Sequence, residues 1–523
     1  MSTTLWITTT PPAPSAELEL GHLAGPYVAA DVLARFLRAD GERVGFTAGI
    51  ADHAASVEVK ASRVGRAPGD VADGYRASIT ADWRHAGVEF DHVVHPRRDP
   101  GYTRWVRALF RRLHTDGALV VRSRPMPHCA PCRRALHGAL VTGGCPHCQA
   151  PAEGGVCRAC ALPNDGGTLT APTCALCGAP AQLRRVSRPY VALEQFREPL
   201  AHHWAASELP PRLAALCEAL AEDGLPDVAV GHPGDWGIPV PLAGFEGYRV
   251  DGCFEEAAMH LFGQGFDKRP LPARTAHFGG FGHTFCHAVL LPALLLARGV
   301  KLPQDFYVNE TYTGAEPAES GKASWALDLL IEYGSDTLRR HVLEDRPAAR
   351  SVGFRMADLD RTRSTLTTTW NGWLGRLFDA VHSENDGMVP ATAPGGAGWT
   401  TQLNRLHRAV EDLRDAYAPG RFDPRRVVLL LDEVVRSTAD FGYANAYQRS
   451  RPGSGGRHLP SLAAQLSVAA ALSAWAAPVM PEGAGRLAAA LGIEPGKPVQ
   501  AAALAGPAPG TPLAPPPAPA FGF

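Results

Sequence analysis

The sequence predicts an α/β chain: a doubly wound parallel sheet, split by a cysteine-rich insertion and followed by an α-helical bundle. Three observations predict this order. Short apolar strands alternate with helical patterns over residues 1–118 and again over 246–334, as in repeated β-α-β units. Eight cysteines fall into four CxxC pairs between residues 129 and 177. Helical patterns then dominate residues 335–492.

Composition limits the kind of protein this chain encodes. Its 523 residues suffice for several domains, and the formal net charge of −1 gives no general attraction to nucleic acid or membrane. No apolar run is long enough to span a bilayer, and the first 15 residues lack the pattern of a signal peptide. We therefore expect a cytoplasmic protein with no membrane partner. Only five of its 51 basic Lys and Arg residues are lysines, so few lysines are available to a site.

The first segment, residues 1–118, contains the strand patterns "TLWITTT", "RVGFTAG" and "FDHVVH". Between the first two lies an amphipathic helix that we expect to begin near Gly25, with Pro26 in its first turn and Gly41 just after its end. Its apolar stripe is formed by Val28, Val32, Leu33, Phe36 and Leu37. This pattern is typical of a β-α-β unit in a parallel sheet.

The insertion, residues 119–245, carries the CxxC pairs in a stretch rich in Gly and Pro. The pairs consist of Cys129, Cys132, Cys145, Cys148, Cys157, Cys160, Cys174 and Cys177. Each pair presents two thiolates from one tight turn, and two turns complete a tetrahedral four-sulfur site that suits Zn²⁺. We therefore predict two structural zinc ions; unliganded core thiols or redox pairs are the alternative. Spacing alone does not decide which pair joins which.

The remaining segments are a second half of the sheet over 246–334, a helical bundle over 335–492 and a tail over 493–523. The sheet segment includes "TAHFGGFGHTFCHAVLLPALLLARG" and "DFYVNETYTG". The bundle includes "SLAAQLSVAAALSAWAAPVMP", a helix that Pro478 and Pro481 should end. The tail is rich in Pro and Ala, which predicts a disordered spacer.

Several stretches resemble the class I aminoacyl-tRNA synthetases, and the methionyl-tRNA synthetases in particular, to about residue 490. They are "ELGHLAGPYVAADVLARFLRADG", the four CxxC pairs, "DWGIPVP", "HAVLLPALLLARG" and "LLIEYGSDTLRRHVLEDRP". The resemblance implies a Rossmann catalytic domain split by a zinc-knuckle insertion, followed by an α-helical bundle like the one that reads the anticodon. It also implies nested knuckles: the inner pairs at 145/148 and 157/160 share one zinc, and the outer pairs share the other.

Enzymes of that family activate methionine with ATP and Mg²⁺ and then esterify tRNA, so the resemblance identifies candidate phosphate contacts. The HIGH-type motif reads Glu19-Leu20-Gly21-His22. Gly21 and His22 match the family, and His22 would meet a phosphate near a helix N-terminus. Glu19 replaces a histidine and should repel ATP unless it turns away or holds Mg²⁺. Alternatively, His22 only preserves the start of a helix.

The other phosphate-binding elements of the family have lost their charges here. Its KMSKS loop falls on residues 315–322, where both lysines are replaced and Lys322 is the nearest lysine. Lys322 either approaches the phosphates or is an ordinary surface lysine. The family's GKD-like turn reads Gly280-Phe281-Gly282. The resemblance therefore implies altered or lost pyrophosphate chemistry.

The family's methionine contacts are changed as well. They fall on Ala13, on Ala51 with Asp52 beside it, on Cys253 and on His260. Asp52 either receives the ammonium group of an amino acid or is a surface acid. His287 matches a position where the family commonly has histidine, with a core histidine as the alternative. Methionine specificity is therefore not predicted.

Three functional hypotheses follow. We favour an activator of a non-methionine amino acid that binds that amino acid and ATP and serves a small-molecule acceptor in specialised metabolism, with a possible partner enzyme in trans. A catalytically inactive pseudo-synthetase used as a binding or scaffold module is second, and a working methionine-tRNA ligase is third. Whether tRNA binds stays open: Trp370, Asn371 and Trp373 either contact a base or, as we favour for the two tryptophans, pack inside the bundle.

Overall fold

The computed structural model describes residues 4–266, 272–300, 303–313, 325–449, 458–494, 498–514 and 519–522. The chain divides into two compact units, each built from separate segments. The first unit comprises residues 1–17, 45–81 and 90–310; the second comprises 18–44, 82–89 and 311–523. The bounds of the five segments expected from the sequence stay predictions. Among the described residues, no helix has the length and apolar character needed to cross a bilayer.

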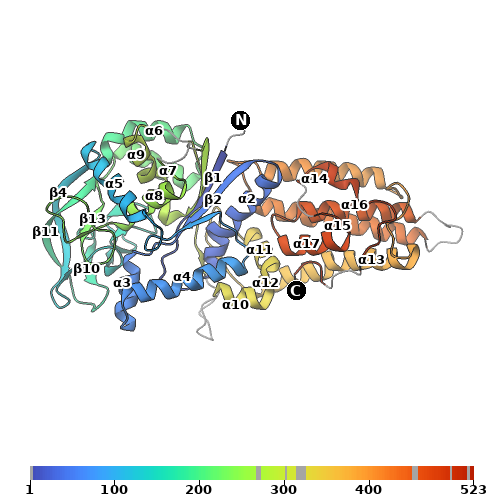
Figure 1. The fold of residues 1–523 in the computed structure, drawn as a ribbon, viewed down its shortest axis with the longest axis horizontal. Helices are drawn as coiled ribbons and strands as arrows, with labels where there is room; N and C mark the ends of the chain where they lie inside the picture. The colour runs from blue at the N-terminus through green and yellow to red at the C-terminus, as the bar shows by residue number, and fades with distance from the viewer. Residues whose placement is uncertain are drawn as a thin grey trace. The chain divides into compact units, whose positions relative to one another are not determined.

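A five-stranded sheet is the centre of the first unit, with strand order β16-β15-β1-β2-β3 (Figure 1). Its strands are β1 (Thr4–Thr9), β2 (Arg43–Gly49), β3 (His92–Val94), β15 (Arg274–Gly280) and β16 (Gln304–Asn309). The β1–β15, β15–β16 and β2–β3 pairs are parallel. The strands on the two sides of β1 come from the two halves of the sequence, so the doubly wound parallel sheet is confirmed.

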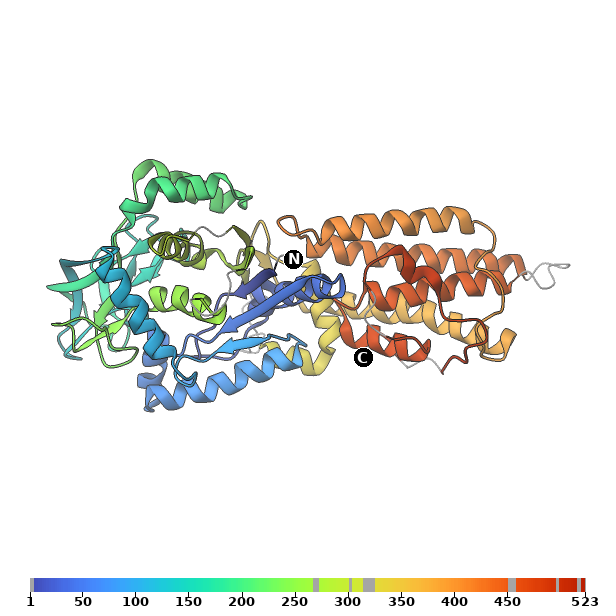
Figure 2. The same cartoon turned by 45° about the horizontal axis from the view of Figure 1, so that its top comes forward.

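Helices of the first unit pack apolar side chains around this sheet. They are α3 (Ala55–Val64), α4 (Pro68–His85), α5 (Tyr102–Thr115), α6 (Arg197–Ala205), α7 (Pro211–Asp223), α8 (Gly252–Gly263) and α9 (Leu291–Ala297). Phe110, Phe254, Leu294 and Phe306 belong to one buried cluster. Figure 2 shows α6 and α7 as an adjacent pair, in green. The short helices of this unit are η2 (Gly138–Leu140), η3 (Leu193–Phe196), η4 (Phe281–His283) and η5 (Cys286–Leu290).

The insertion folds as short antiparallel strands. β4 (Leu119–Cys129) pairs with β11 (Gln182–Val191) along ten residue pairs from Leu119↔Val191 to His128↔Gln182. The smaller strands are β5 (Arg134–Ala135), β6 (Val141–Gly144), β7 (Pro151–Glu153), β8 (Gly155–Val156), β9 (Pro163–Asn164), β10 (Thr170–Cys174), β12 (Val228–Ala229), β13 (Gly231–Pro233) and β14 (Tyr248–Val250). The long β4–β11 pair thus carries the cysteine-rich loops at one end.

In the second unit, the helix expected to begin near Gly25 begins earlier, so that expectation was wrong. The helical segment runs through α1 (Leu20–His22), η1 (Leu23–Tyr27) and α2 (Val28–Ala39). Pro26 lies inside η1, a π-helical turn, and not in the first turn. A π turn inserts one extra residue and leaves backbone groups unpaired, so a proline without N–H is accommodated there.

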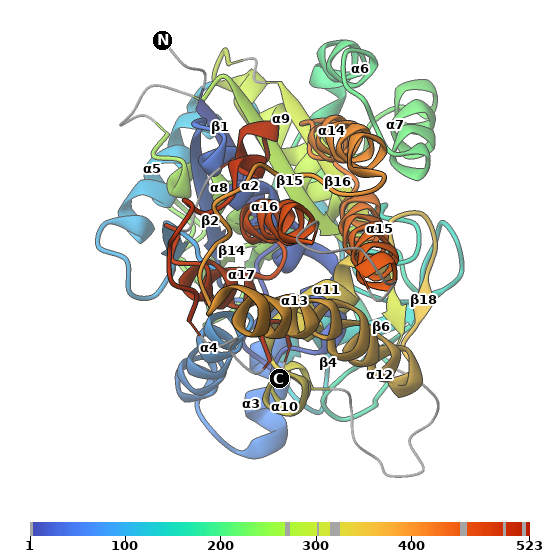
Figure 3. The ribbon, with the colours of Figure 1, turned by 90° about the vertical axis from the view of Figure 1, so that its right-hand side faces the viewer.

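The bundle of the second unit consists mainly of helices (Figure 3). Its helices are α10 (Ala326–Tyr333), α11 (Ser335–Glu344), α12 (Met356–Ser364), η6 (Thr365–Trp370), α13 (Asn371–Asn385), α14 (Trp399–Ala416), α15 (Pro424–Arg449), α16 (Leu459–Trp475), α17 (Pro481–Ala490) and η7 (Ala501–Ala505). Two short strands, β17 (Tyr312–Thr313) and β18 (Val352–Gly353), pair beside it. As predicted, α16 ends before Pro478.

Arg339 explains why the stretch "SDTLRRHVLEDRP" is distinctive. Its guanidinium is 1% exposed and donates to Asp31 at 2.7 Å and to the carbonyls of Val479, Pro478 and Ala86 at 2.8, 2.9 and 3.1 Å. A buried charge is tolerated when it is paired and fully hydrogen-bonded. One arginine thereby ties α2, α11 and the loop between α16 and α17 together.

The tail contradicts the expectation of a disordered spacer in its described parts. Phe521 is 0% exposed, and its ring lies 4.9 Å from that of Trp370. Asn371 donates to the Phe521 carbonyl at 2.6 Å and accepts from its N–H at 2.9 Å. Apolar side chains placed between prolines, Leu513 among them, are enough to anchor the segment.

Candidate functional site

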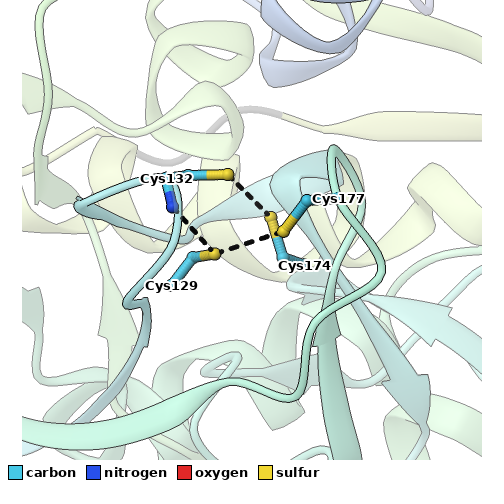
Figure 4. A group of neighbouring side chains, drawn as sticks. All are labelled: Cys129, Cys132, Cys174 and Cys177. Carbon is cyan, nitrogen blue, oxygen red and sulfur yellow. Dashed lines mark hydrogen bonds between the residues drawn. The ribbon is translucent and has the colours of Figure 1, made fainter.

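The four outer cysteines form one compact cluster. Cys129, Cys132, Cys174 and Cys177 offer sulfur atoms that all lie within 4.8 Å of one another (Figure 4). The Cys129–Cys177 and Cys132–Cys174 Sγ distances are 3.5 and 3.9 Å. Four thiolates held tetrahedrally at the usual Zn–S length would lie about 3.8 Å apart. The donor set and its spacing therefore fit one zinc ion.

The inner cysteines form a second cluster with the same spacing. Cys145, Cys148, Cys157 and Cys160 also lie within 4.8 Å of one another. The Cys145–Cys160 and Cys148–Cys157 Sγ distances are both 3.8 Å. The nested pairing implied by the family resemblance is thus the pairing seen in the structure. Four thiolates would fill the tetrahedral coordination of each ion, the arrangement that is typical of structural zinc sites.

Each CxxC turn has the same backbone form. The residue after the second cysteine has a positive φ in every case: 52° at Arg133, 63° at Gln149, 58° at Ala161 and 73° at Gly178. The N–H of Gln149, Ala161 and Gly178 bonds back to the carbonyl of the first cysteine of its pair. Three non-glycine residues therefore sit in the left-handed region, a conformation that the surrounding structure must hold in place.

His22 lies in the first turn of the α1–α2 helical segment, in the second unit. Its side chain is exposed, and its Nδ1 accepts the backbone N–H of Glu19 at 3.0 Å. A neutral imidazole that accepts at Nδ1 carries its proton at Nε2, which makes Nε2 a donor. A donor at a helix start suits an anionic phosphate. Glu19, whose side chain is also exposed, is the N-cap residue.

Gly21 has a packing reason to be glycine. A Cβ there would meet the Tyr312 carbonyl oxygen at 3.2 Å and Tyr312 Cβ at 3.4 Å. A larger residue would force the helix start away from β17. Lys322, the other predicted phosphate contact, lies outside the described residues, as does the KMSKS-like stretch from 315.

Ala13 and Asp52 lie in loops that follow the carboxyl ends of β1 and β2, the edge where parallel sheets bind ligands. The two loops meet, because the Ala51 N–H donates to the Pro12 carbonyl at 2.9 Å. Asp52 is 0% exposed, so the alternative of a surface acid was wrong.

The Asp52 carboxyl is only partly hydrogen-bonded. Its Oδ2 accepts the Arg97 N–H at 3.2 Å, and its Oδ1 has no hydrogen-bond partner among the described groups. Arg76 Nη1 lies 3.9 Å from Oδ1. Burial raises the Asp52 pKa, against the opposing effect of these neighbours. An ammonium group is one chemical partner that this oxygen fits.

Cys253 is disulfide-bonded to Cys286, which the sequence did not indicate. Cys253 stands in the sequence analysis as a candidate substrate contact, and in the structure its sulfur is bonded to that of Cys286. The bond joins the start of α8 to the start of η5, with a Cα–Cα distance of 5.9 Å. It brings together two helices that carry the predicted substrate residues His260 and His287.

His260 and His287 lie together, and Glu256 lies with them. Their ligand atoms are all within 4.8 Å of one another. His287 Nε2 lies 2.7 Å from Glu256 Oε1, and His283 Nδ1 lies 3.6 Å from Glu256 Oε2. His260 is 5% exposed and its Nε2 has no hydrogen-bond partner among the described groups.

The charges of this cluster follow from its burial. Burial lowers the pKa of His260 to about 3, so that imidazole is neutral at ordinary pH. Burial acts to raise the pKa of Glu256, but His283 and His287 outweigh it and hold that pKa below its usual range. The cluster is therefore a buried carboxylate beside a neutral imidazole.

Glu256 is the member of the cluster that sequence reasoning missed. The signal was present: Glu256 and His260 are four residues apart, as are His283 and His287, and that spacing puts two side chains on one helical face. In the bundle, the packing alternative for the tryptophans is confirmed. Trp370 and Trp373 are each 1% exposed, and their indole N–H groups donate to Asp432 and Gln465 at 2.9 and 3.1 Å.

Comparison with known proteins finds relatives in sequence and in fold. A sequence model of the family described as tRNA synthetases class I (M) matches residues 5–250. The methionine–tRNA ligase of Thermomicrobium roseum is 27% identical over 428 residues, covering 78% of this chain and 73% of the relative. That of Dehalococcoides mccartyi strain CBDB1 is 27% identical over 406 residues, covering 73% and 72%.

A solved structure shares the fold over the whole chain. Mycobacterium tuberculosis methionyl-tRNA synthetase in complex with methionyl-adenylate superposes with a TM-score of 0.79 at 20% identity, covering 100% of both chains. The parallel sheet, the insertion with two four-cysteine clusters and these matches define a class I aminoacyl-tRNA-synthetase-like protein. Within that class the chain is methionyl-tRNA-synthetase-like.

Proposed function

We propose that the protein activates an amino acid other than methionine as its adenylate and passes the acyl group to a small-molecule acceptor. In the first step the amino-acid carboxylate attacks the α-phosphorus of ATP, an O–P bond forms, the bond between the α-phosphorus and the bridging oxygen breaks, and pyrophosphate leaves. In the second step a nucleophile of the acceptor attacks the acyl carbon, and AMP leaves. The observation that carries the proposal is the buried Glu256–His287 pair with His260, in the region where the family resemblance expects methionine contacts.

This cluster is the wrong chemistry for a thioether side chain. A methionine side chain offers weak acceptance and no donor. Buried polar groups left without partners cost free energy, so a site of this kind favours a substrate that pairs with them and rejects one that does not. The partly unpaired Asp52 carboxyl, at the carboxyl edge of the sheet, is the candidate partner for the ammonium group.

Support for the nucleotide half of the reaction comes from the helix start at Leu20. The Nδ1 contact of His22 leaves its proton on Nε2, where a donor to phosphate is needed. Zinc, held by the two cysteine clusters, would supply only structural support to the insertion.

Support for a small-molecule acceptor comes from the bundle. The two tryptophans that would stack on a base are buried, and the Asn371 amide is committed to the Phe521 backbone. The resemblance places an anticodon-contacting asparagine near Asn371. These commitments favour an acceptor other than tRNA.

Amino-acid-dependent pyrophosphate exchange tests the proposal, run over the twenty standard amino acids and several hydroxylated ones. We expect one or a few polar amino acids to exceed methionine. The family resemblance implies a tyrosine at position 260. His260→Tyr should lower pyrophosphate exchange with those amino acids about tenfold or more. The exposed His202→Gln variant, on α6, is the control and should leave exchange unchanged.

A second candidate, a pseudo-synthetase that binds without catalysis, is favoured by the loss of both KMSKS lysines and by Glu19. Each lost donor to a developing charge lowers a rate roughly 10²–10³-fold. Flat exchange for every amino acid, with no ATP-induced rise in melting temperature, would support it against our proposal. Fastest exchange with methionine would instead indicate a working methionine-tRNA ligase.

A further inference from the structure

The Glu256–His260–His287 cluster has the ingredients of a metal site separate from the cysteines. It offers two imidazole nitrogens and one carboxylate oxygen, all within 4.8 Å of one another. The side chains of Glu256 and His287 are 11% and 4% exposed. Nitrogen and oxygen donors of this kind, two histidines with one glutamate, suit Zn²⁺ and neighbouring divalent transition metals.

The backbone presents these donors from two facing segments. Glu256 and His260 lie one turn apart on α8, so they share one face. His287 lies in the π-helical turn η5, which packs against α8. The Cys253–Cys286 disulfide joins the two segments three residues before Glu256 and one residue before His287. The donors are therefore held together by a covalent link before any ion arrives.

Hydrogen bonding in the cluster is incomplete in a way that a cation would complete. His260 Nε2 is buried and lacks a partner among the described residues. The neighbouring His277 differs, because its nitrogens lie 2.9 Å from Thr8 Oγ1 and 2.8 Å from Gln304 Nε2. One histidine of the group is thus committed to its surroundings, while His260 keeps a buried ring nitrogen without a partner among the described groups.

We propose that Glu256, His260 and His287 bind a divalent metal ion of the zinc class. Three protein ligands leave at least one coordination position open. His283, whose Nδ1 lies 3.6 Å from Glu256 Oε2, holds the carboxylate in position from the outer side. If the protein activates an amino acid as proposed above, the open position accepts a donor atom from the side chain of that amino acid. The substrate class is then an amino acid with a metal-coordinating side chain.

Metal content per chain tests the site without any reaction. Full-length protein loaded with Zn²⁺ and freed of excess should hold three ions: one in each cysteine cluster and one here. His260→Ala and the isosteric Glu256→Gln should each hold two, and His202→Gln should hold three. A count of two in the unaltered protein after loading, together with no ligand-field response to Co²⁺, would overturn the proposal.

Titration with Co²⁺ covers the case in which the third ion is lost during purification or a variant folds poorly. Added to protein whose cysteine clusters already hold zinc, Co²⁺ should give ligand-field absorption without the thiolate-to-cobalt charge-transfer band. No absorption change at millimolar Co²⁺, or a charge-transfer band alone, would contradict the site. If the chain binds no third ion but still catalyses pyrophosphate exchange with a polar amino acid, the proposed function stands and the proposed metal site is wrong.

Discussion

At the scale of single residues, His22 shows how a backbone contact sets side-chain chemistry. The Glu19 N–H donates to His22 Nδ1 at 3.0 Å, so a neutral His22 imidazole carries its proton on Nε2. Glu19 has the opposite effect on a phosphate, because it brings a negative charge to the place where that phosphate would bind. The site retains one donor and has gained one repulsive group.

Replacing Glu19 with histidine should therefore speed adenylation. Glu19→His removes the negative charge and restores a donor, which we expect to raise the pyrophosphate-exchange rate with the preferred amino acid by about tenfold or more. Glu17→His, a matched change at an exposed acid two residues earlier, should have little effect. An unchanged or lower rate for Glu19→His would show that Glu19 does not face the nucleotide.

His341 should make the stability of the protein depend on pH. It is 2% exposed, and burial lowers its pKa from 6.5 to about 4. Between these values the unfolded chain takes up a proton that the folded chain does not. This contribution to stability is complete above pH 6.5 and is lost as the pH falls toward 4.

The urea midpoint at pH 7 and at pH 4.5 measures this effect. His341→Gln should lose less stability than the unaltered protein between the two pH values, because its unfolded chain takes up about one proton fewer. The exposed His202→Gln variant should lose as much as the unaltered protein. Equal losses in all three proteins would place the acid sensitivity in other groups.

At the scale of elements, the CxxC turns depend on what lies between them. Three of the turns hold a non-glycine residue in the left-handed region, which costs free energy. The apolar cluster around the outer cysteines is small, so we expect it to contribute little stability. Zinc bound at the two clusters would supply that stability, since binding free energy at a structural site is also folding free energy. The two clusters use separate cysteines, so they should lose metal independently.

Cys157→Ser should lower the zinc content by one ion per chain and leave the outer cluster loaded, because hydroxyl oxygen replaces one of four thiolates. Metal analysis after gel filtration measures this. Cys217→Ser changes a buried thiol of α7 outside the clusters and should leave the zinc content as it was. Loss of two ions from Cys157→Ser would mean that the knuckles fold as one unit.

The tail is a second element whose behaviour contradicts its composition. Phe521 fills a place beside Trp370, and truncating a buried phenylalanine to alanine typically costs about 3–5 kcal/mol. We expect Phe521→Ala to lower the free energy of unfolding by that amount in urea titration. Pro509→Ala, at an exposed tail position, should change it little. A small effect from Phe521→Ala would mean that the tail is not anchored in solution.

At the scale of the whole molecule, periodicity and spacing predicted much of the fold. Strand patterns gave β1, β2 and β3, and the four CxxC pairs gave two four-sulfur clusters. Both signals are local, because a strand or a turn is encoded by neighbouring residues. The start of the helix at Leu20 was not predicted, because a proline usually marks the first turn of a helix and Pro26 instead lies inside a π-helical turn.

Features that depend on contacts far apart in sequence were harder to predict. The Cys253–Cys286 bond joins residues 33 apart, and neither has a CxxC partner to mark it. The pairing of Phe521 with Asn371 spans 150 residues. The role of Glu256 emerged only when the structure placed it beside His287, although its spacing to His260 was visible beforehand.

The central claim is that a methionyl-tRNA-synthetase-like fold now activates a different amino acid. Incubation of the protein with ATP and an equimolar mixture of amino acids, followed by mass spectrometry of the protein-bound adenylate, tests it in one measurement. We predict an adenylate whose mass corresponds to a polar, donor-bearing amino acid, with no methionyl-adenylate above background. Methionyl-adenylate as the main species, or no adenylate at all, would contradict the account.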